Sequence, residues 1–76
     1  MYKIYTLENC PNCEELKNNL KINSIAYEEV NIENDFLARA KMIENDLEEL
    51  PVIEQNGKLK SGNIMELLNQ IINEKV

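Results

Sequence analysis

Apolar residues recur along this chain at two spacings, and the changes between them divide it into seven short elements. Residues 2–7 are rich in β-branched and aromatic side chains, which is typical of a strand. Leu16 and Leu20 then stand four positions apart among charged residues, which predicts a helix from Pro11 to about Ile22. Pro11 falls in the first turn of this helix, where its missing N–H costs nothing.

The middle of the chain predicts a second strand and a second helix. Residues 25–32 form the predicted strand, with Val30 and Ile32 on one face and an acidic middle that suits a sheet edge. Either Asn34 or Asp35 is placed to cap the helix that follows. The helix carries an apolar stripe that we expect to pack in the core: Phe36, Ala40, Ile43 and Leu47.

The last third of the chain predicts a hairpin and a final helix. Residues 50–54 and 58–61 form two strands joined by Asn56-Gly57, the strongest short hairpin signal. Gly62-Asn63 then break the chain. The remaining apolar positions have the spacing of an amphipathic helix that packs on the sheet: Ile64, Leu67, Leu68, Ile71 and Ile72.

This order of elements, βαβ followed by ββα, predicts an α/β fold. A right-handed crossover makes the first two strands parallel, and the hairpin adds two more. We therefore expect a mixed four-stranded sheet with helices on both faces. No repeat, low-complexity tract or linker interrupts the sequence, so we expect residues 1–76 to form a single domain.

The composition gives this fold an acidic surface. The net charge is −6, and the eight Lys and Arg residues form no basic stripe, which argues against a nucleic-acid partner. The acids concentrate at Glu28-Glu29 and between Glu33 and Glu49. They predict a solvated outer face or, alternatively, a surface that steers a basic partner. No apolar run approaches the ~20 residues of a membrane span, so no membrane partner is expected.

The start of the chain bears on its location. The N-terminus leads directly into the first strand, with no basic segment followed by a long apolar run. We therefore expect no secretory signal and a cytoplasmic protein, in which a cysteine pair rests as a dithiol.

Two cysteines, the only ones in the chain, stand in the tetrapeptide Cys10-Pro11-Asn12-Cys13 at the junction of the first strand and helix. Unpaired N–H groups and the positive end of the helix dipole stabilise a thiolate at Cys10. Cys13 lies one turn further on, close enough to resolve a mixed disulfide formed at Cys10. The motif therefore predicts thiol–disulfide exchange, with Cys10 and Cys13 as the catalytic residues.

Two other interpretations of the cysteine pair are weaker. A structural disulfide over so short a loop would add only about 2 kcal/mol of stability. A zinc site needs about four ligands, and a chain without histidine or a third cysteine offers no such set. The alternative function is a non-catalytic carrier, with a metal or iron–sulfur cluster bridged between two chains.

A second motif, Leu50-Pro51-Val52, opens the third predicted strand. With the order of elements and the cysteine tetrapeptide, it resembles the thioredoxin fold and, more narrowly, the glutaredoxin-like redoxins. The resemblance implies that the bond before Pro51 is cis and that Pro51 shapes the site together with Pro11 and Asn12. It also implies that Leu50 and the Ser61-Gly62 pair bind the substrate, because Leu50 offers its backbone and Gly62 lets a partner's backbone approach.

Some positions depart from the glutaredoxin pattern. Leu7 and Ile64 stand where glutaredoxins commonly carry the lysine and aspartate that bind glutathione, and Asn12 replaces a tyrosine. The motifs at Pro51 and Gly62 are more similar to NrdH-type redoxins, which are reduced by thioredoxin reductase and donate electrons to ribonucleotide reductase.

The resemblance thus implies a small thiol–disulfide oxidoreductase that acts on protein disulfides, with ribonucleotide reductase as one acceptor. It implies no bound cofactor and no metal. The redox-active Cys10–Cys13 disulfide is recycled by an external reductant, either glutathione or a thioredoxin-reductase-type flavoprotein. We expect a monomer whose partners are a protein disulfide substrate and a reductase.

Overall fold

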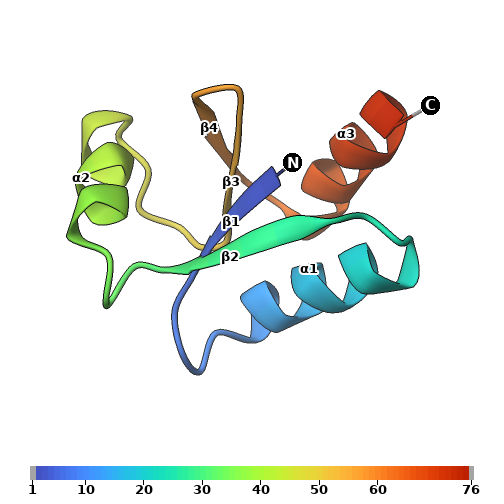
Figure 1. Cartoon of the computed structure of the whole chain (residues 1–76), viewed down its shortest axis with the longest axis horizontal. Helices are drawn as coiled ribbons and strands as arrows, with labels where there is room; N and C mark the ends of the chain where they lie inside the picture. The colour runs from blue at the N-terminus through green and yellow to red at the C-terminus, as the bar shows by residue number, and fades with distance from the viewer. Residues whose placement is uncertain (1, 76) are drawn as a thin grey trace.

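The computed structural model describes residues 2–75, without the side chains of Glu74 and Lys75. Along the described chain the elements are the strand β1 (Tyr2–Thr6), the helix α1 (Pro11–Ile22), β2 (Tyr27–Asn31), α2 (Phe36–Glu44), β3 (Val52–Gln55), β4 (Lys58–Ser61) and α3 (Ile64–Lys75) (Figure 1). The predicted order and type of these elements are confirmed, and α1 has its predicted bounds.

The strands form one mixed sheet in the order β2-β1-β3-β4. β1 pairs in parallel with β2, with Thr6 opposite Asn31, so both strands finish at the same end of the sheet. β3 runs antiparallel to β1, and β4 antiparallel to β3. At the hairpin, Asn56 and Gly57 have positive φ angles of 53° and 80°, the backbone that favours Asn-Gly in a tight turn.

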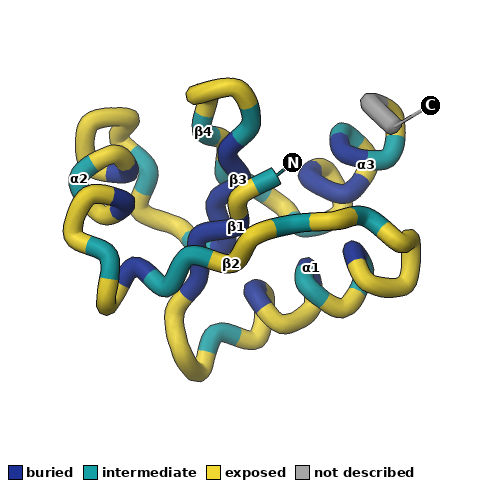
Figure 2. Tube along the Cα trace, viewed as in Figure 1, coloured by how far each residue is buried: buried dark blue, intermediate teal, exposed yellow. Residues whose placement is uncertain are grey.

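Helices cover both faces of the sheet, as predicted. α1 and α3 lie against one face and α2 against the other (Figure 1). Because side chains alternate along a strand, Ile4 and Ile53 point to the first face, and Tyr5 and Val52 to the second. The buried core of the first face consists of Ile4, Leu16, Leu20, Ile53, Leu67, Leu68 and Ile71. In Figure 2 the buried residues are concentrated in β1 and β3, with separate buried positions on α1, α2 and α3.

The expected core stripe of α2 is wrong at Phe36 and Ile43, whereas Leu47, which follows the helix, packs partly buried against the core as expected. Phe36 and Ile43 of the predicted core stripe are 82% and 72% exposed, whereas Ala38 and Met42 are buried against the sheet. The side chain of Asp35 caps the helix by accepting a hydrogen bond from the Ala38 amide at 3.0 Å. Because Phe36 precedes Ala38 by two positions, or about 200° of helix, Phe36 points away from the core that Ala38 enters.

β4 has its predicted bounds, whereas β1, β2 and β3 are shorter than predicted because residues at their ends belong to loops. β1 stops at Thr6, one residue before the expected end, and β3 starts at Val52 rather than residue 50. β2 starts at Tyr27, since the Ile25 amide still bonds to the Leu20 carbonyl oxygen of α1 at 2.9 Å. Between residues 2 and 75 no helix combines the length and the apolar character that a membrane crossing requires.

Candidate active site

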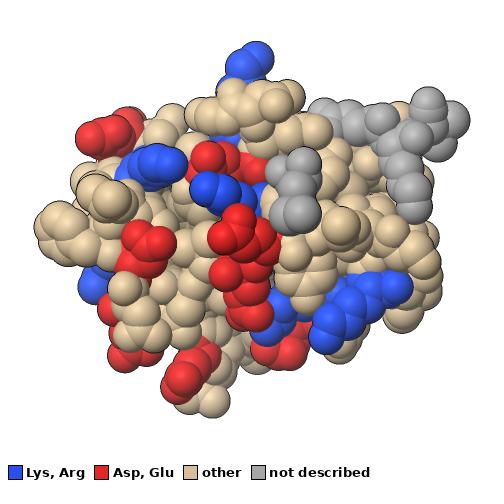
Figure 3. Space-filling model, in the orientation of Figure 1, with Lys and Arg blue, Asp and Glu red and all other residues tan. Residues whose placement is uncertain are grey.

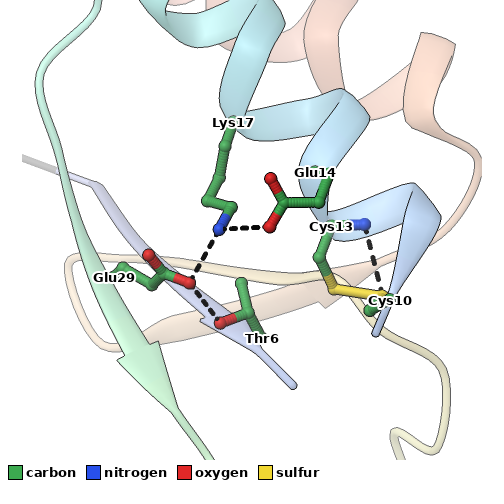
Figure 4. The surroundings of a disulfide bond; sticks show 6 residues. All are labelled: Thr6, Cys10, Cys13, Glu14, Lys17 and Glu29. Atoms are coloured by element: carbon green, nitrogen blue, oxygen red, sulfur yellow. Dashed lines mark hydrogen bonds and ion pairs between the residues drawn. A yellow bond between two sulfur atoms is a disulfide. The ribbon is translucent and has the colours of Figure 1, made fainter. Parts of the chain in front are cut away.

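The two cysteines stand where β1 gives way to α1, joined as a disulfide (Figure 4). Cys10 is the N-cap of α1, and its Sγ accepts a hydrogen bond from the Cys13 amide at 3.2 Å. Cys10 is half-buried, while Cys13 is fully buried on the core side of the helix. A sulfur in the N-cap position faces unpaired helix amides and the positive dipole end, which favour a thiolate over a thiol.

Pro11 and Asn12 complete the first turn of α1 on its solvent side. Pro11 opens the helix, where it gives up no hydrogen bond, and both side chains are exposed. The turn therefore presents Cys10 at the surface next to Asn12 and keeps Cys13 behind it. This is the geometry needed for one sulfur that attacks and a second that resolves.

Pro51 lies next to this turn, and the Leu50–Pro51 bond is cis, as predicted. Tyr5 of β1 pairs with Val52 of β3, so Pro51 extends β3 to the end of β1 from which the cysteine loop departs. Pro51 is fully buried there, and Leu50 is half-buried against the α2 side of the core. The structure therefore brings the second motif to the same end of the sheet as the first.

Ser61 and Gly62 reach the same end through the hairpin, because Ser61 pairs with Val52. Gly62 has φ = 152°, which L side chains rarely adopt, whereas an added Cβ would meet only Glu66 Oε2 at 3.6 Å. Backbone conformation rather than space therefore requires glycine here. A cavity of about 470 Å³, which we call the Gly62 hollow, is lined by Asn12, Glu15, Glu49, Gly62, Asn63, Ile64 and Met65.

On the other side of α1 lies a group of charged residues that the sequence analysis did not identify (Figure 4). The Lys17 ammonium contacts Glu14 at 2.7 Å and Glu29 at 3.0 Å, and the Thr6 hydroxyl donates to Glu29 at 2.8 Å. The Lys17 side chain is only 14% exposed. A cavity of about 430 Å³, which we call the Glu29 hollow, is lined by Leu7, Glu8, Glu14, Lys17, Glu29 and Asn31.

These contacts shift the ionisation of both partners. The hydrogen bond to Glu14, followed by that to Glu29, raises the pKa of Lys17 above its ordinary value. The hydrogen bond from Lys17, followed by that from Thr6, lowers the pKa of Glu29. Both residues are therefore charged near neutral pH. The signal for Lys17 was present in the sequence, since it follows Cys13 by four residues and so lies on the same helix face.

Among residues 2–75, no group of three or more His, Cys, Asp or Glu side chains is arranged to hold a metal ion. The groups that meet at this end of the sheet are the two sulfurs, the backbone around Pro51 and Gly62, and the charges that line the two hollows.

A sequence model of the family described as Glutaredoxin matches residues 3–60. The chain belongs to the glutaredoxin family. A glutaredoxin-like fold with a cysteine pair at the start of its first helix is that of a thiol–disulfide oxidoreductase. The predicted family, fold class and enzyme class are thereby confirmed.

Solved structures show the same fold. The thioredoxin-like protein BC3987 is 32% identical over 93% of this chain and 99% of its own, with a TM-score of 0.78. NrdH-redoxin from Escherichia coli, a glutaredoxin-like protein with a thioredoxin-like activity profile, is 21% identical over 92% of both chains, with a TM-score of 0.81. The glutaredoxin (grx-1) from Archaeoglobus fulgidus is 26% identical over 93% of this chain and 84% of its own, with a TM-score of 0.68. A search among curated proteins gave no significant match.

Proposed function

We propose that this glutaredoxin-family protein reduces protein disulfides and takes its electrons from a thioredoxin-reductase-type flavoprotein rather than from glutathione. Ribonucleotide reductase is the proposed acceptor, because the motifs at Pro51 and Gly62 resemble those of NrdH-type redoxins. The observation that carries the proposal is the arrangement of the sulfurs, with Cys10 as the helix N-cap and Cys13 fully buried behind it. We place the reaction in the cytoplasm, where dithiols are maintained, with the protein acting as a monomer.

The chemistry runs in two exchange steps. The Cys10 thiolate attacks one sulfur of the substrate disulfide, forms a mixed disulfide and releases the other substrate sulfur as a thiolate. The Cys13 thiolate then attacks the Cys10 sulfur, closes the Cys10–Cys13 bond and releases the second substrate sulfur. Two electrons pass from the cysteine pair to the substrate, and the two protons lost by the pair balance those gained by the substrate thiols.

The backbone around the sulfurs suits an extended polypeptide. In this proposal the backbone of Leu50, which precedes Pro51 at the end of the sheet from which the cysteine loop departs, pairs with the substrate, and Gly62 bounds an open hollow at that end. A segment that enters there gains main-chain hydrogen bonds in the manner of an added strand. This mode of binding needs no particular side chain in the substrate and so fits a protein disulfide.

Glutathione needs charged partners, and two positions where glutaredoxins commonly carry them hold apolar residues in this chain. Leu7 lines the Glu29 hollow and Ile64 lines the Gly62 hollow, and neither side chain pairs with a charge. Lys58 and Lys60 line a separate cavity together with Gln70 instead of either hollow. The lysines of β4 are therefore not placed to replace the missing contacts.

The test is insulin reduction with NADPH as the electron source. One arm contains glutathione and its reductase, and the other contains a thioredoxin-reductase-type flavoprotein. We expect faster precipitation of insulin in the second arm. Equal or faster reduction in the first arm would reject the proposed donor, and no reduction in either arm would reject the proposed activity. An absorbance spectrum of freshly purified protein distinguishes the oxidoreductase from the alternative, a carrier of an iron–sulfur cluster, because a protein with a cluster is coloured and a dithiol protein is not.

A further inference from the structure

Both hollows beside the cysteine pair are acidic. The Glu29 hollow is lined by Glu8, Glu14 and Glu29, and the Gly62 hollow by Glu15 and Glu49. These cavities adjoin the reactive turn directly, since Asn12 lines one of them and Glu14, the neighbour of Cys13, lines the other. A substrate that reaches Cys10 must therefore place its neighbouring residues close to carboxylates.

Among the residues that the structure describes, few cations balance these carboxylates, and Lys21 acts on Glu29 only from outside the lining of its hollow. Lys17 is the only Lys or Arg among the residues that line the two hollows, and its ammonium is already held by Glu14 and Glu29. The Gly62 hollow has no basic lining residue, and Glu66 adds a further carboxylate oxygen near Gly62. Figure 3, in the orientation of Figure 1, shows acidic side chains in the middle of the view and near the β1–α1 loop, with Lys or Arg side chains beside those in the middle.

We propose that the two hollows select disulfides whose reactive cysteine is flanked by basic residues, and that they disfavour anionic disulfides. This inference rests on the proposed function. The substrate class is thus a cationic segment of a protein. Glutathione carries two carboxylates and one ammonium, so the hollows disfavour its net negative charge.

The geometry explains why residues on both sides of the substrate cysteine affect its selection. Asn12 and Glu14 line different hollows and stand two positions, or about 200°, apart on α1, so the hollows flank the start of the helix. An extended chain advances about 3.3–3.6 Å per residue. A chain that crosses Cys10 therefore exposes the residues on its two sides to different hollows. Each exposed ion pair is worth a factor of about 1.4 to 5 in kcat/KM, and long-range attraction adds to the rate of association.

The probe is a set of three short peptides, each with one cysteine in a mixed disulfide with thionitrobenzoate. The cysteine is flanked on both sides by Lys, by Gln or by Glu. Reduced protein attacks the peptide sulfur and releases the thionitrobenzoate anion, which is followed by absorbance in single-turnover mixing. We expect the Lys peptide to react fastest and the Glu peptide slowest, with about ten-fold or more between them at low salt. The difference should collapse near 1 M salt, where the Debye length is about 3 Å.

Paired variants separate local from overall charge. The double variant Glu15→Gln/Glu49→Gln should lower the ratio of Lys-peptide to Glu-peptide rates several-fold. The control Glu28→Gln/Glu33→Gln removes the same charge from exposed residues outside both hollows and should leave the ratio near the wild-type value.

The outcomes are distinct. Equal rates for the Lys and Glu peptides would overturn the selectivity while leaving the proposed disulfide chemistry intact. An equal fall of the ratio in both double variants would overturn the role of the hollows and assign the preference to net charge. Failure of all three peptides to release thionitrobenzoate would reject the proposed function, and the inference with it.

Discussion

The proposed weak recognition of glutathione can be tested by gain of function. The double variant Leu7→Lys/Ile64→Asp places a cation in the Glu29 hollow and an anion in the Gly62 hollow, at the two positions where glutaredoxins carry such residues. The substitutions cancel in charge, so the net charge of −6 is unchanged. Any gain toward glutathione is therefore due to the new contacts.

The expected gain in affinity for glutathione depends on how exposed positions 7 and 64 are. A hydrogen bond to a charged group is worth about 1.5–3 kcal/mol, but Leu7 is 37% exposed, and a pair in that setting is worth about 0.2–1 kcal/mol. Ile64 is half-buried in the first turn of α3, so an aspartate there keeps more of the full value. The two contacts together contribute about 2–4 kcal/mol, or roughly 30- to 1,000-fold in affinity.

The assay follows NADPH oxidation by glutathione reductase with hydroxyethyl disulfide as the substrate. We expect wild-type protein to turn over slowly, without saturating as glutathione rises through the millimolar range, and the double variant to saturate at far lower glutathione. Leu7→Gln/Ile64→Asn is the matched control, because it adds polarity without charge. A wild-type protein that already saturates in the low-millimolar range or below would refute the reasoning.

Other predictions concern the helix register and the charge pair. Phe36→Ala should change the free energy of unfolding by no more than about 0.5 kcal/mol, because the side chain is exposed. Met42→Ala should lower the free energy of unfolding by about 2–5 kcal/mol, because the side chain is buried. Urea denaturation measures both values, and a larger loss for Phe36→Ala than for Met42→Ala would contradict the observed register. Glu29 has a lowered pKa, so its stabilisation is present above the unfolded value of 4.5 and is lost as pH falls through the folded value. Stability should therefore fall less on acidification in Glu29→Gln than in wild type, and identical urea midpoints against pH would contradict this.

The fold was predictable because its local signals agree with one another. Pro11 and the charged pattern around Leu16 define α1, and Asn56-Gly57 defines the hairpin through its backbone preference alone. The reactive turn was predictable for the same reason, since two cysteines three apart at a strand–helix junction admit few arrangements. The cis bond before Pro51 came from the family resemblance, as local preference favours trans.

The register of α2 was not predictable from periodicity. Phe36 and Ile43 form one stripe at helical spacing and Ala38 and Met42 another, so the pattern fits two orientations. Ala38 and Met42 pack against the sheet, and the larger side chains of Phe36 and Ile43 lie at the surface. Hydrophobicity alone favours burial of Phe36 and Ile43, which is why the predicted register was wrong for these two residues.

The Lys17–Glu29 contact could not be predicted from the sequence for a different reason. It joins α1 to β2 across twelve residues of sequence, and which face of β2 meets α1 depends on the pairing of β1 with β2. Sequence spacing places Lys17 on the helix face of Cys13 but says nothing of the strand opposite. The acidic character of the two hollows likewise emerges only when loops distant in sequence meet at one end of the sheet.

The central claim is that Cys10 attacks and Cys13 resolves. Its most direct test mixes reduced Cys13→Ser protein with a disulfide-bonded peptide and identifies the adduct by mass spectrometry under non-reducing conditions. The account predicts a stable mixed disulfide at Cys10, no such adduct with Cys10→Ser, and preferential alkylation of Cys10 over buried Cys13 in the reduced wild type. A stable adduct at Cys13 in the Cys10→Ser protein, with Cys13 alkylated first in wild type, would contradict it.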